Sequence, residues 1–422
     1  MSDVASDPER SDPHVSRRWR GLASILCGDD FKPWLPGRHR AHELRDALSR
    51  VWSVQRQIGV TRVARLTDYD YVGIPVAGTI RPAVADAQIT ATQGKGLTEA
   101  EALVSALMEA AERHAAAQPL ASKRATAREL AASGREHASL GSLGIQASND
   151  AELEWVVGHS LKDAARTLIP RAAVSFPYFV PQGLVRPLHP STTGLAAGGT
   201  LAEALTQALF EVLERDAVSR FLEGEEFPLL DLSSLGPSTE AALVRRFSDQ
   251  DVRVFVADLS ATSPVSVYFA CGFNPDGPGP TFLTAGQGAH LSPRIALRRA
   301  LLELAQSRVV ALQGSREDLV RHASDWQETP EESRETWLGY RALCARLPPR
   351  SLPSEGSPGN CGADSLSALL SRLDDHGYEQ VLFVELTQPR IALPVVRALI
   401  PGCVDTFVDP DRRRTHVFQS RG

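Results

Sequence analysis

Three stretches of the sequence align with one another without gaps: TEAEALVSALMEAAERHAA (98–116), TLAEALTQALFEVLERDAV (200–218) and SPRIALRRALLELAQSRVV (292–310). Each opens with a Thr or Ser, residues that cap helix N-termini, and apolar residues then recur at helical spacing. The first two stretches continue as T-x-x-E capping boxes, whereas the third has Pro at the first helical position. The repeated pattern predicts three helices that begin at Thr98, Thr200 and Ser292.

A glutamate occupies the same place in all three predicted helices, with alanines three and seven residues before it. A carboxylate or carboxamide follows one turn later. The two sets are Glu109, Glu211 and Glu303, and then Glu112, Glu214 and Gln306. One such helix is most simply a solvent-exposed face with Glu–Arg pairs, but three copies favour a cluster of five glutamates around several cations. Oxygen ligands select Mg²⁺ or Ca²⁺, and Mg²⁺ that bridges nucleotide phosphates is the commonest case. The alanines beside the glutamates are expected to let another group approach the helix backbone closely.

The composition is that of a globular protein and excludes several classes of function. The chain has 422 residues, of which 43% are hydrophobic and 23% charged, with a net charge of −6, and its length predicts two or three structural units fused into one body. There is no basic patch for nucleic acid, no apolar run that could span a membrane and no signal peptide. The five scattered cysteines form no C-x-x-C pair, which indicates a reducing compartment, and we expect the cytoplasm.

The remaining sequence predicts a mixed α+β fold, because strand-like runs outnumber any regular strand–helix alternation. A further helix is expected over about 40–58, and residues 120–150 are expected to form surface helix and loop. The Ser-, Asp- and Arg-rich start (1–20) is expected to be disordered, 347–365 to be a flexible loop and 411–422 to be a polar tail. Strand-like runs occupy 62–67, 74–80, 152–159, 171–181, 252–260, 265–273 and 379–387.

These motifs resemble those of the YcaO family, a likeness that spans about residues 35–405. It is carried by TATQGKGLTEAEALVSALMEAAERH (90–114), TTGLAAGGTLAEALTQALFEVLERDAV (192–218) and RRALLELAQSR (298–308), with weaker matches at 58–82 and 394–402. The resemblance implies a catalytic domain over 35–410 with mostly antiparallel sheets and three Glu-bearing helices around ATP and Mg²⁺. It also implies activation of a peptide backbone amide, whose oxygen leaves as phosphate. The product is then an azoline, an amidine or a thioamide, according to the nucleophile.

The resemblance assigns roles to individual residues. The implied magnesium ligands are Glu109, Glu112, Glu211, Glu214 and Glu303, and the implied nucleotide contacts are Lys95, Ser105, Glu203, Arg215, Arg299 and Gln306. Arg38 or Arg40 falls where the family often has a basic residue near the phosphates. Two departures are Gly199, where the family usually has Asn, and Leu44, where it has Ser or Thr. Glu203 is equally well explained as part of a capping box, and His290 either faces the cluster or is structural.

Three classes of function remain open from the sequence. The first is an ATP-dependent enzyme that modifies a ribosomally made precursor peptide by cyclodehydration, or by thioamide formation with a TfuA-like partner. The second is a non-catalytic scaffold, and the third is a ligase-type enzyme that uses ATP on a small amino acid or thiol. No G-x-x-x-x-G-K-[ST], H-E-x-x-H or G-x-S-x-G motif supports another catalytic class. With no Pro-rich C-terminal end or fused leader-binding domain visible in the sequence, we expect the protein to act alone or to recruit a separate leader-binding protein. We also expect a homodimer.

Overall fold

The computed structural model describes residues 22–33, 41–84, 89–184, 191–277, 281–314, 330–354 and 362–405. The expected tails at 1–20 and 411–422 lie outside these residues, as do Arg38 and Arg40. The described chain forms three sheets with helices packed against them, which confirms the predicted α+β class.

Every pairing between the strands of these sheets is antiparallel, as the family resemblance implied. One sheet has the order β1 (Arg62–Arg65), β2 (Val76–Ile80), β3 (Ala91–Lys95). A second has the order β10 (Leu283–His290), β9 (Ser266–Phe273), β8 (Arg253–Asp258). The third has the order β4 (Ser122–Ala125), β5 (Leu153–Ser160), β11 (Leu382–Glu385), β12 (Val395–Leu399), β7 (Leu195–Ala197), and β6 (Arg166–Pro170) pairs with β5.

The three predicted helices are confirmed at their N-termini. They are α3 (Glu99–Ala116), α5 (Leu201–Leu222) and α7 (Pro293–Gln313). The side chains of Thr98, Thr200 and Ser292 each accept a hydrogen bond from the backbone N–H three residues later. The caps therefore set where each helix starts, and with it the position of every glutamate along the helix axis.

Each of these helices packs against the strand that immediately precedes it, so the repeat is a strand–turn–helix unit. A Cβ atom at Gly94 of β3 would lie 2.1 Å from the backbone N of Ala106 and 2.3 Å from the backbone O of Ala102. At Gly288 of β10, the equivalent position, it would lie 2.3 Å from the backbone O of Ala296. The alanines are therefore buried against the strand backbone, and this strand is the group that approaches the helix closely.

Six further α-helices lie in the described part of the chain. They are α1 (Leu22–Ile25), α2 (Leu44–Val54), α4 (Ala127–Ala132), α6 (Thr239–Ser248), α9 (Pro330–Cys344) and α10 (Gly362–Asp375). The helix predicted over 40–58 corresponds to α2, whereas β4 lies in the region expected to be helix and loop. Residues 355–361 of the expected loop at 347–365 lie outside the described residues, and the last four positions, 362–365, belong to α10, whose Gly362 packs against α5.

One predicted strand is wrong. Residues 171–181 form no strand; β6 ends at Pro170, and Arg171–Ala173 is a short 3-10 helix. Val174 is fully buried in the cluster that also contains Leu195 and Leu382, so the apolar character of this stretch reflects core packing. Pro177 and Pro181 have no N–H group for a strand ladder.

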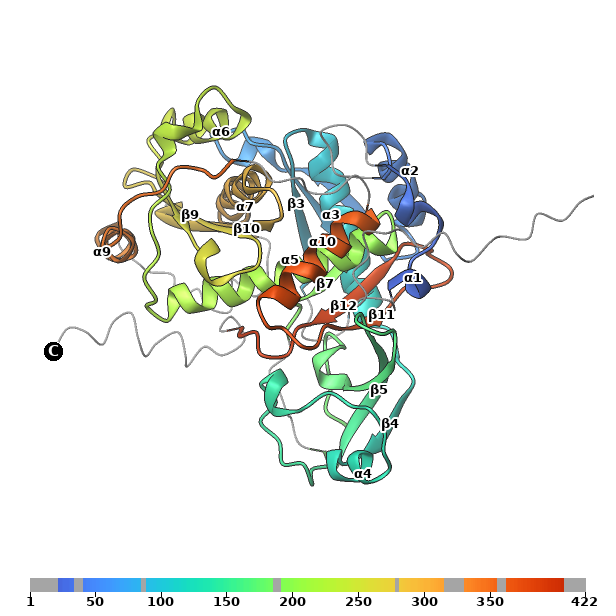
Figure 1. Cartoon of the computed structure of the whole chain (residues 1–422). Helices are drawn as coiled ribbons and strands as arrows, with labels where there is room; N and C mark the ends of the chain where they lie inside the picture. Colours follow the sequence, from blue (N-terminus) through green and yellow to red (C-terminus); the bar gives the residue numbers. More distant parts are fainter. Residues whose placement is uncertain are drawn as a thin grey trace, which may run out of the picture.

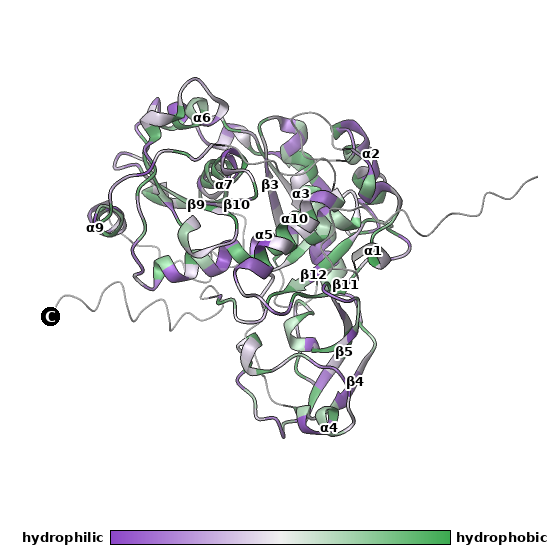
Figure 2. Ribbon diagram, viewed as in Figure 1, coloured by the Kyte–Doolittle hydropathy of each residue, from purple (hydrophilic) through white to green (hydrophobic). Residues whose placement is uncertain are grey.

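The core is built around α5, which contacts β7, β12, β10 and α10 (Figure 1). A helix that is apolar on nearly all sides is typically buried, and α5 is buried along most of its length. The hydrophobic strands β11 and β12, green in Figure 2, connect this core to a smaller part that projects from the body and contains β4, α4 and β5. Among the described residues, no helix combines the length and hydropathy needed to cross a membrane.

Candidate metal and nucleotide site

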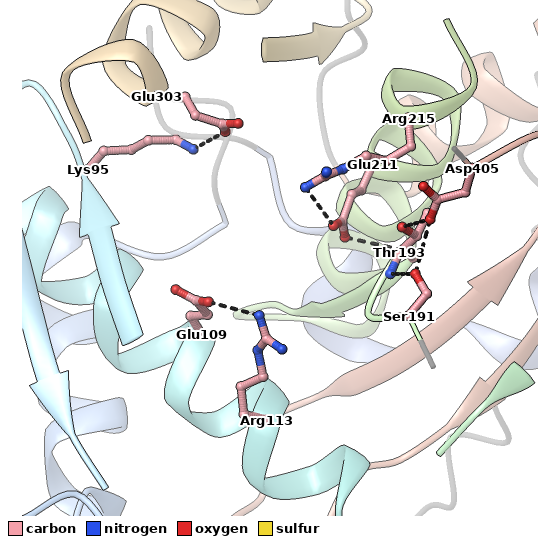
Figure 3. A network of polar contacts seen from close by, with 10 residues as sticks. Lys95, Glu109, Arg113, Ser191, Thr193, Glu211, Arg215, Glu303 and Asp405 are labelled. Carbon is pink, nitrogen blue, oxygen red and sulfur yellow. Dashed lines mark hydrogen bonds and ion pairs between the residues drawn. The ribbon is translucent and has the colours of Figure 1, made fainter. Parts of the chain in front are cut away.

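The three equivalent glutamates lie around one common space. Figure 3 shows Glu109, Glu211 and Glu303 reaching this space from α3, α5 and α7. Each sits at the same place in its strand–turn–helix unit, so the packing of strand on helix positions all three. The sequence prediction that five glutamates converge around bound cations stays a prediction.

A cation accompanies each of these three glutamates. Lys95 Nζ lies 2.5 Å from Glu303 Oε2. Arg113 Nη2 lies 3.3 Å from Glu109 Oε1, and Arg215 Nη2 lies 4.0 Å from Glu211 Oε1, both one helical turn along the same helix. All six side chains keep 17–26% of their surface exposed, so the pairs are reachable by solvent.

Backbone N–H groups fix three of the carboxylates. Gln93 N–H donates to Glu109 Oε2 at 3.1 Å, and Gly194 N–H donates to Glu211 Oε2 at 3.3 Å. Ala197 N–H donates to Glu112 Oε1 at 2.7 Å, which ties the second glutamate of α3 to β7. The main chain therefore orients these carboxylate oxygens, and because it is already ordered it loses little conformational freedom when a ligand binds.

Three of the glutamates at the site are harder to ionise than a free glutamate. Burial, with a further contribution from the charges of Glu109 and Glu211, raises the pKa of Glu112 well above its ordinary value. Burial and then the charge of Glu303 raise the pKa of Glu214 to about 7. Burial also raises the pKa of Glu211. Buried carboxylates that share one space resist ionising together, and a bound cation would relieve that cost.

Glu303 behaves differently from its neighbours. Burial alone would raise its pKa, but Lys95, followed by Arg215 and Arg299, holds the pKa of Glu303 below its ordinary value. In the Glu214–Glu303 pair, Glu303 is therefore the member that stays charged, and Glu214 takes the proton.

The five carboxylates fit a hard divalent cation by their chemistry, since carboxylate oxygens are what Mg²⁺ prefers. As they stand, no three His, Cys, Asp or Glu side chains in the part of the chain that the structure describes are already arranged as a ligand set. The oxygens of Glu109, Glu211 and Glu303 are instead near Arg113, Arg215 and Lys95, respectively. The assignment of these glutamates as metal ligands stays a prediction.

The residues implied to contact nucleotide divide into two groups. Lys95, Arg215 and Arg299 all act electrostatically on Glu214, so they lie at the carboxylate site. Arg299 also donates to Gln207 Oε1 at 2.6 Å. Ser105 and Gln306 are half-buried on α3 and α7, and their role stays a prediction.

Glu203 instead forms hydrogen bonds that hold the N-terminal end of α5 in place. Its carboxylate accepts N–H bonds from Ala41 at 2.7 Å and from Gly199 at 2.9 Å, and its own N–H is capped by Thr200. A Cβ atom at Gly199 would lie 2.9 Å from the His42 ring and 3.0 Å from Glu203, so these side chains occupy the space next to it.

His290 has a structural environment. It is 4% exposed, its Nδ1 accepts the N–H of Ser292 at 2.9 Å, and its ring packs 4.9 Å from that of Phe210. These contacts favour the structural alternative.

Several residues near the site were given no role from the sequence. Arg113 follows Glu112 in the repeat as Arg215 follows Glu214, but only Arg215 was expected to contact the nucleotide. Asp405 accepts hydrogen bonds from Ser191 at 3.0 Å and from Thr193 at 2.5 Å and lies within electrostatic reach of Arg215 (Figure 3). Nothing in local sequence brings these residues together, because about 212 positions separate Thr193 from Asp405.

Arg397 of β12 was also missed. It is 4% exposed, its Nε donates to Ala173 O at 3.1 Å, and its Nη1 has no hydrogen-bond partner among the described residues. Burial lowers its pKa to about 10, so the guanidinium remains charged at neutral pH. It lies within electrostatic reach of Glu211 and Asp405.

Comparison with known proteins adds independent information. A family model described as YcaO cyclodehydratase, ATP- and Mg²⁺-binding, matches residues 93–404. An uncharacterized protein of Methanothermobacter thermautotrophicus is 33% identical over 84% of this chain and 92% of its own length. A Rhizobium leguminosarum bv. trifolii protein encoded in the tfuA 3′ region is 26% identical over 82% of this chain and 84% of its own. The structure is similar to that of YcaO from Methanopyrus kandleri bound with AMPPCP and Mg²⁺. The TM-score is 0.70 and the sequences are 26% identical, and the match covers 89% of this chain and 94% of that one.

Proposed function

The chain belongs to the YcaO family, and on that premise we propose that it uses ATP and Mg²⁺ to activate a backbone amide of a ribosomally made precursor peptide. The proposed product is an azoline or an amidine, formed by cyclodehydration. The observation that carries the proposal is the convergence of three equivalent glutamates, with Lys95 and Arg215, on one space. The family model's description of ATP and Mg²⁺ binding supports the cofactors.

The five glutamates, Glu109, Glu112, Glu211, Glu214 and Glu303, would hold Mg²⁺. When bound, Mg²⁺–ATP supplies the phosphoryl group that converts a poor oxygen leaving group into phosphate. Phosphoryl transfer depends mainly on positioning and charge neutralisation, so few groups of the protein need to react. Lys95, Arg215 and Arg299 bring positive charge to the place where phosphate oxygens would lie, and Ser105 and Gln306 are proposed to contact the nucleotide.

Three of the five cysteines are poor candidates for a covalent enzyme intermediate, which supports direct phosphorylation of the tetrahedral adduct. Burial raises the pKa of Cys344 to about 12, and it raises the pKa of Cys271 still further. Burial also raises the pKa of Cys403 to about 12. A thiolate is the nucleophilic form of cysteine, so these three side chains are poor nucleophiles at neutral pH.

Thioamide formation with a TfuA-like partner is the second candidate. It is supported by the 26%-identical relative encoded in the tfuA 3′ region, which matches 82% of this chain. The two candidates share the amide activation and differ in the nucleophile, which is a side chain or amine in one and sulfide in the other. A purely structural scaffold is disfavoured, because all five glutamates are present and a scaffold would be free to lose them.

The test uses a candidate precursor peptide with ¹⁸O in its backbone amides, incubated with the protein, ATP and Mg²⁺. We expect peptide modification to be coupled to ATP hydrolysis and the label to appear in inorganic phosphate. A modified peptide that retains its label, with none in phosphate, would contradict the mechanism. Adding sulfide and a TfuA-like protein in a parallel reaction distinguishes the candidates, because a thioamide changes the product mass differently from loss of water.

A further inference from the structure

The segment that follows β12 reaches the site from outside the three glutamate-bearing helices. Val404 N–H donates to Asp216 Oδ1 of α5 at 2.8 Å. The next residue, Asp405, lies within electrostatic reach of Arg215, the residue of α5 that precedes Asp216 (Figure 3). Two neighbouring residues of α5 therefore meet this segment, one at its backbone and the other at a carboxylate.

The carboxylate of Asp405 is itself held in place. Ser191 Oγ donates to Asp405 Oδ2 at 3.0 Å, and Thr193 Oγ1 donates to the same oxygen at 2.5 Å. Thr193 N–H donates in turn to Ser191 Oγ at 3.0 Å, so the two hydroxyl groups form one small network just before β7. Hydrogen bonds to an ionised acceptor are among the stronger ones, and two of them restrict the orientation of this carboxylate.

The guanidinium of Arg215 depends on groups outside its own helix for its orientation. Its Nη2 lies 4.0 Å from Glu211 Oε1, which is beyond hydrogen-bond distance. The side-chain oxygen of Gln287 on β10, in the amide orientation that its neighbours require, accepts from Arg215 Nε and Nη1, both at 3.3 Å. Burial alone would lower the pKa of Arg215, but surrounding carboxylates, among them that of Asp405, hold it above its ordinary value.

We infer that Asp405 is a positioning residue, which holds the Arg215 guanidinium in the orientation in which it meets the nucleotide. This inference rests on the proposed function, in which Arg215 contacts the nucleotide, and it makes the segment after β12 part of the site. Charged groups in a site act through their orientation, so a displaced guanidinium loses much of its effect on a bound phosphate. Asp405 itself touches neither the nucleotide nor Mg²⁺.

The sign of the effect distinguishes this role from a direct one. Like charges repel, so a carboxylate that acted only through its own charge would oppose the nucleotide phosphates, and its removal would tighten nucleotide binding. A carboxylate that bound Mg²⁺ directly would weaken nucleotide binding when removed, whether or not Arg215 is present. A carboxylate that positions Arg215 weakens binding when removed, but only while Arg215 is there to be positioned.

The test is a double-mutant cycle between Asp405→Asn and Arg215→Met. Asparagine has nearly the same size as aspartate, and its oxygen can still accept from Ser191 and Thr193, so the variant removes the charge and keeps these bonds. Calorimetry of AMPPCP binding with Mg²⁺ is expected to show about 5-fold weaker binding for Asp405→Asn in the otherwise wild-type chain. In the Arg215→Met chain, Asp405→Asn is expected to cause no further weakening.

Asp249→Asn is the matched control. Asp249 is exposed at the C-terminal end of α6, so this variant removes the same charge at a place away from the site. We expect its AMPPCP affinity and its melting temperature to equal those of the wild type. Thr193→Val carries the test if the Asp405 variant fails to fold, because it removes one of the two hydroxyls that hold the carboxylate. It should weaken AMPPCP binding in the same direction, again only while Arg215 is present.

The outcomes separate this inference from the proposed function. A wild-type chain that binds Mg²⁺–AMPPCP, with an Asp405→Asn variant that binds it as tightly or more tightly, overturns the positioning role alone. Equal weakening by Asp405→Asn with and without Arg215 overturns it as well. A wild-type chain that binds no Mg²⁺–AMPPCP overturns the proposed function itself.

Discussion

Replacing Gly94 with alanine should disrupt both the fold and the site, because this residue is where β3 and α3 come closest. The added Cβ would lie 2.1 Å from the Ala106 backbone N, whereas ordinary contact begins at 3.4 Å, so α3 would have to move by about 1.3 Å. Its neighbours there are backbone atoms of Ala106 and Ala102, which cannot rotate away as a side chain can. Overpacking costs about 1–3 kcal/mol, and we expect a loss near 3 kcal/mol.

The assay is thermal and urea unfolding of Gly94→Ala beside Gly339→Ala. At about 2 °C per kcal/mol for a chain of this size, the melting temperature should fall by about 6 °C. Gly339 lies in the middle of α9 with nothing within 4 Å of its added Cβ, so alanine there should stabilise the helix by about 0.5–1 kcal/mol. AMPPCP binding should weaken in Gly94→Ala, since the shift moves Glu109 away from Gln93. A Gly94→Ala protein with wild-type stability would refute the packing argument.

Two further predictions concern charge. The folded-state pKa of Glu214, about 7, lies above the ordinary value of 4.5, so the native state holds an extra proton between these values. The unfolding free energy of the ligand-free protein should therefore fall from pH 5 to pH 7.5, and Glu214 should account for up to about 3 kcal/mol of this fall. Over the same range the affinity for Mg²⁺ should rise. Calorimetry in which Mg²⁺ binds equally tightly at pH 6 and pH 8 would contradict this. Arg308 and Asp70 form a buried pair at 2.8 Å, with 3% and 6% of their side chains exposed. Arg308→Met should lower the free energy of unfolding by about 3–5 kcal/mol, because it leaves the Asp70 carboxylate buried without a counter-charge. In urea unfolding, the double variant Arg308→Met/Asp70→Leu should recover much of this loss. An equal loss in both variants would show that the buried charge is not the cause.

The helices that carry the site could be predicted from the sequence because their signals are local. Thr98, Thr200 and Ser292 cap the helices within one turn, and the equal spacing to Glu109, Glu211 and Glu303 required no knowledge of tertiary contacts. Three repeats of one pattern also constrained the interpretation more than any single helix.

What the helices face could not be predicted in the same way. The alanines indicated a close approach to the helix without saying by what, and the structure places the glycines of β3 and β10 there. Small residues on a helix indicate only that something comes close. The glycines were visible in the sequence, and their spacing to the alanines, eight and twelve residues in both units, was the signal that was overlooked.

The parts that were missed depend on contacts between distant segments. Arg397 and Asp405 reach the site only because β12 pairs with β7 and the following turn brings Asp405 to Thr193. The run 171–181 was predicted as a strand because its apolar residues are buried, although no neighbouring strand pairs with them in the described part of the chain. Burial and strand pairing produce the same composition over short stretches.

The central claim is that the glutamates of the three strand–turn–helix units hold ATP through Mg²⁺, and one calorimetric experiment tests it most directly. AMPPCP is titrated into the wild-type protein, Glu211→Gln and the exposed control Glu225→Gln, each with Mg²⁺ and with EDTA. We predict Mg²⁺-dependent binding in the wild type and the control, and a loss of tenfold or more, at least about 1.4 kcal/mol, in Glu211→Gln with an unchanged melting temperature. Wild-type affinity in a folded Glu211→Gln protein, or binding that is equally tight in EDTA, would contradict the claim.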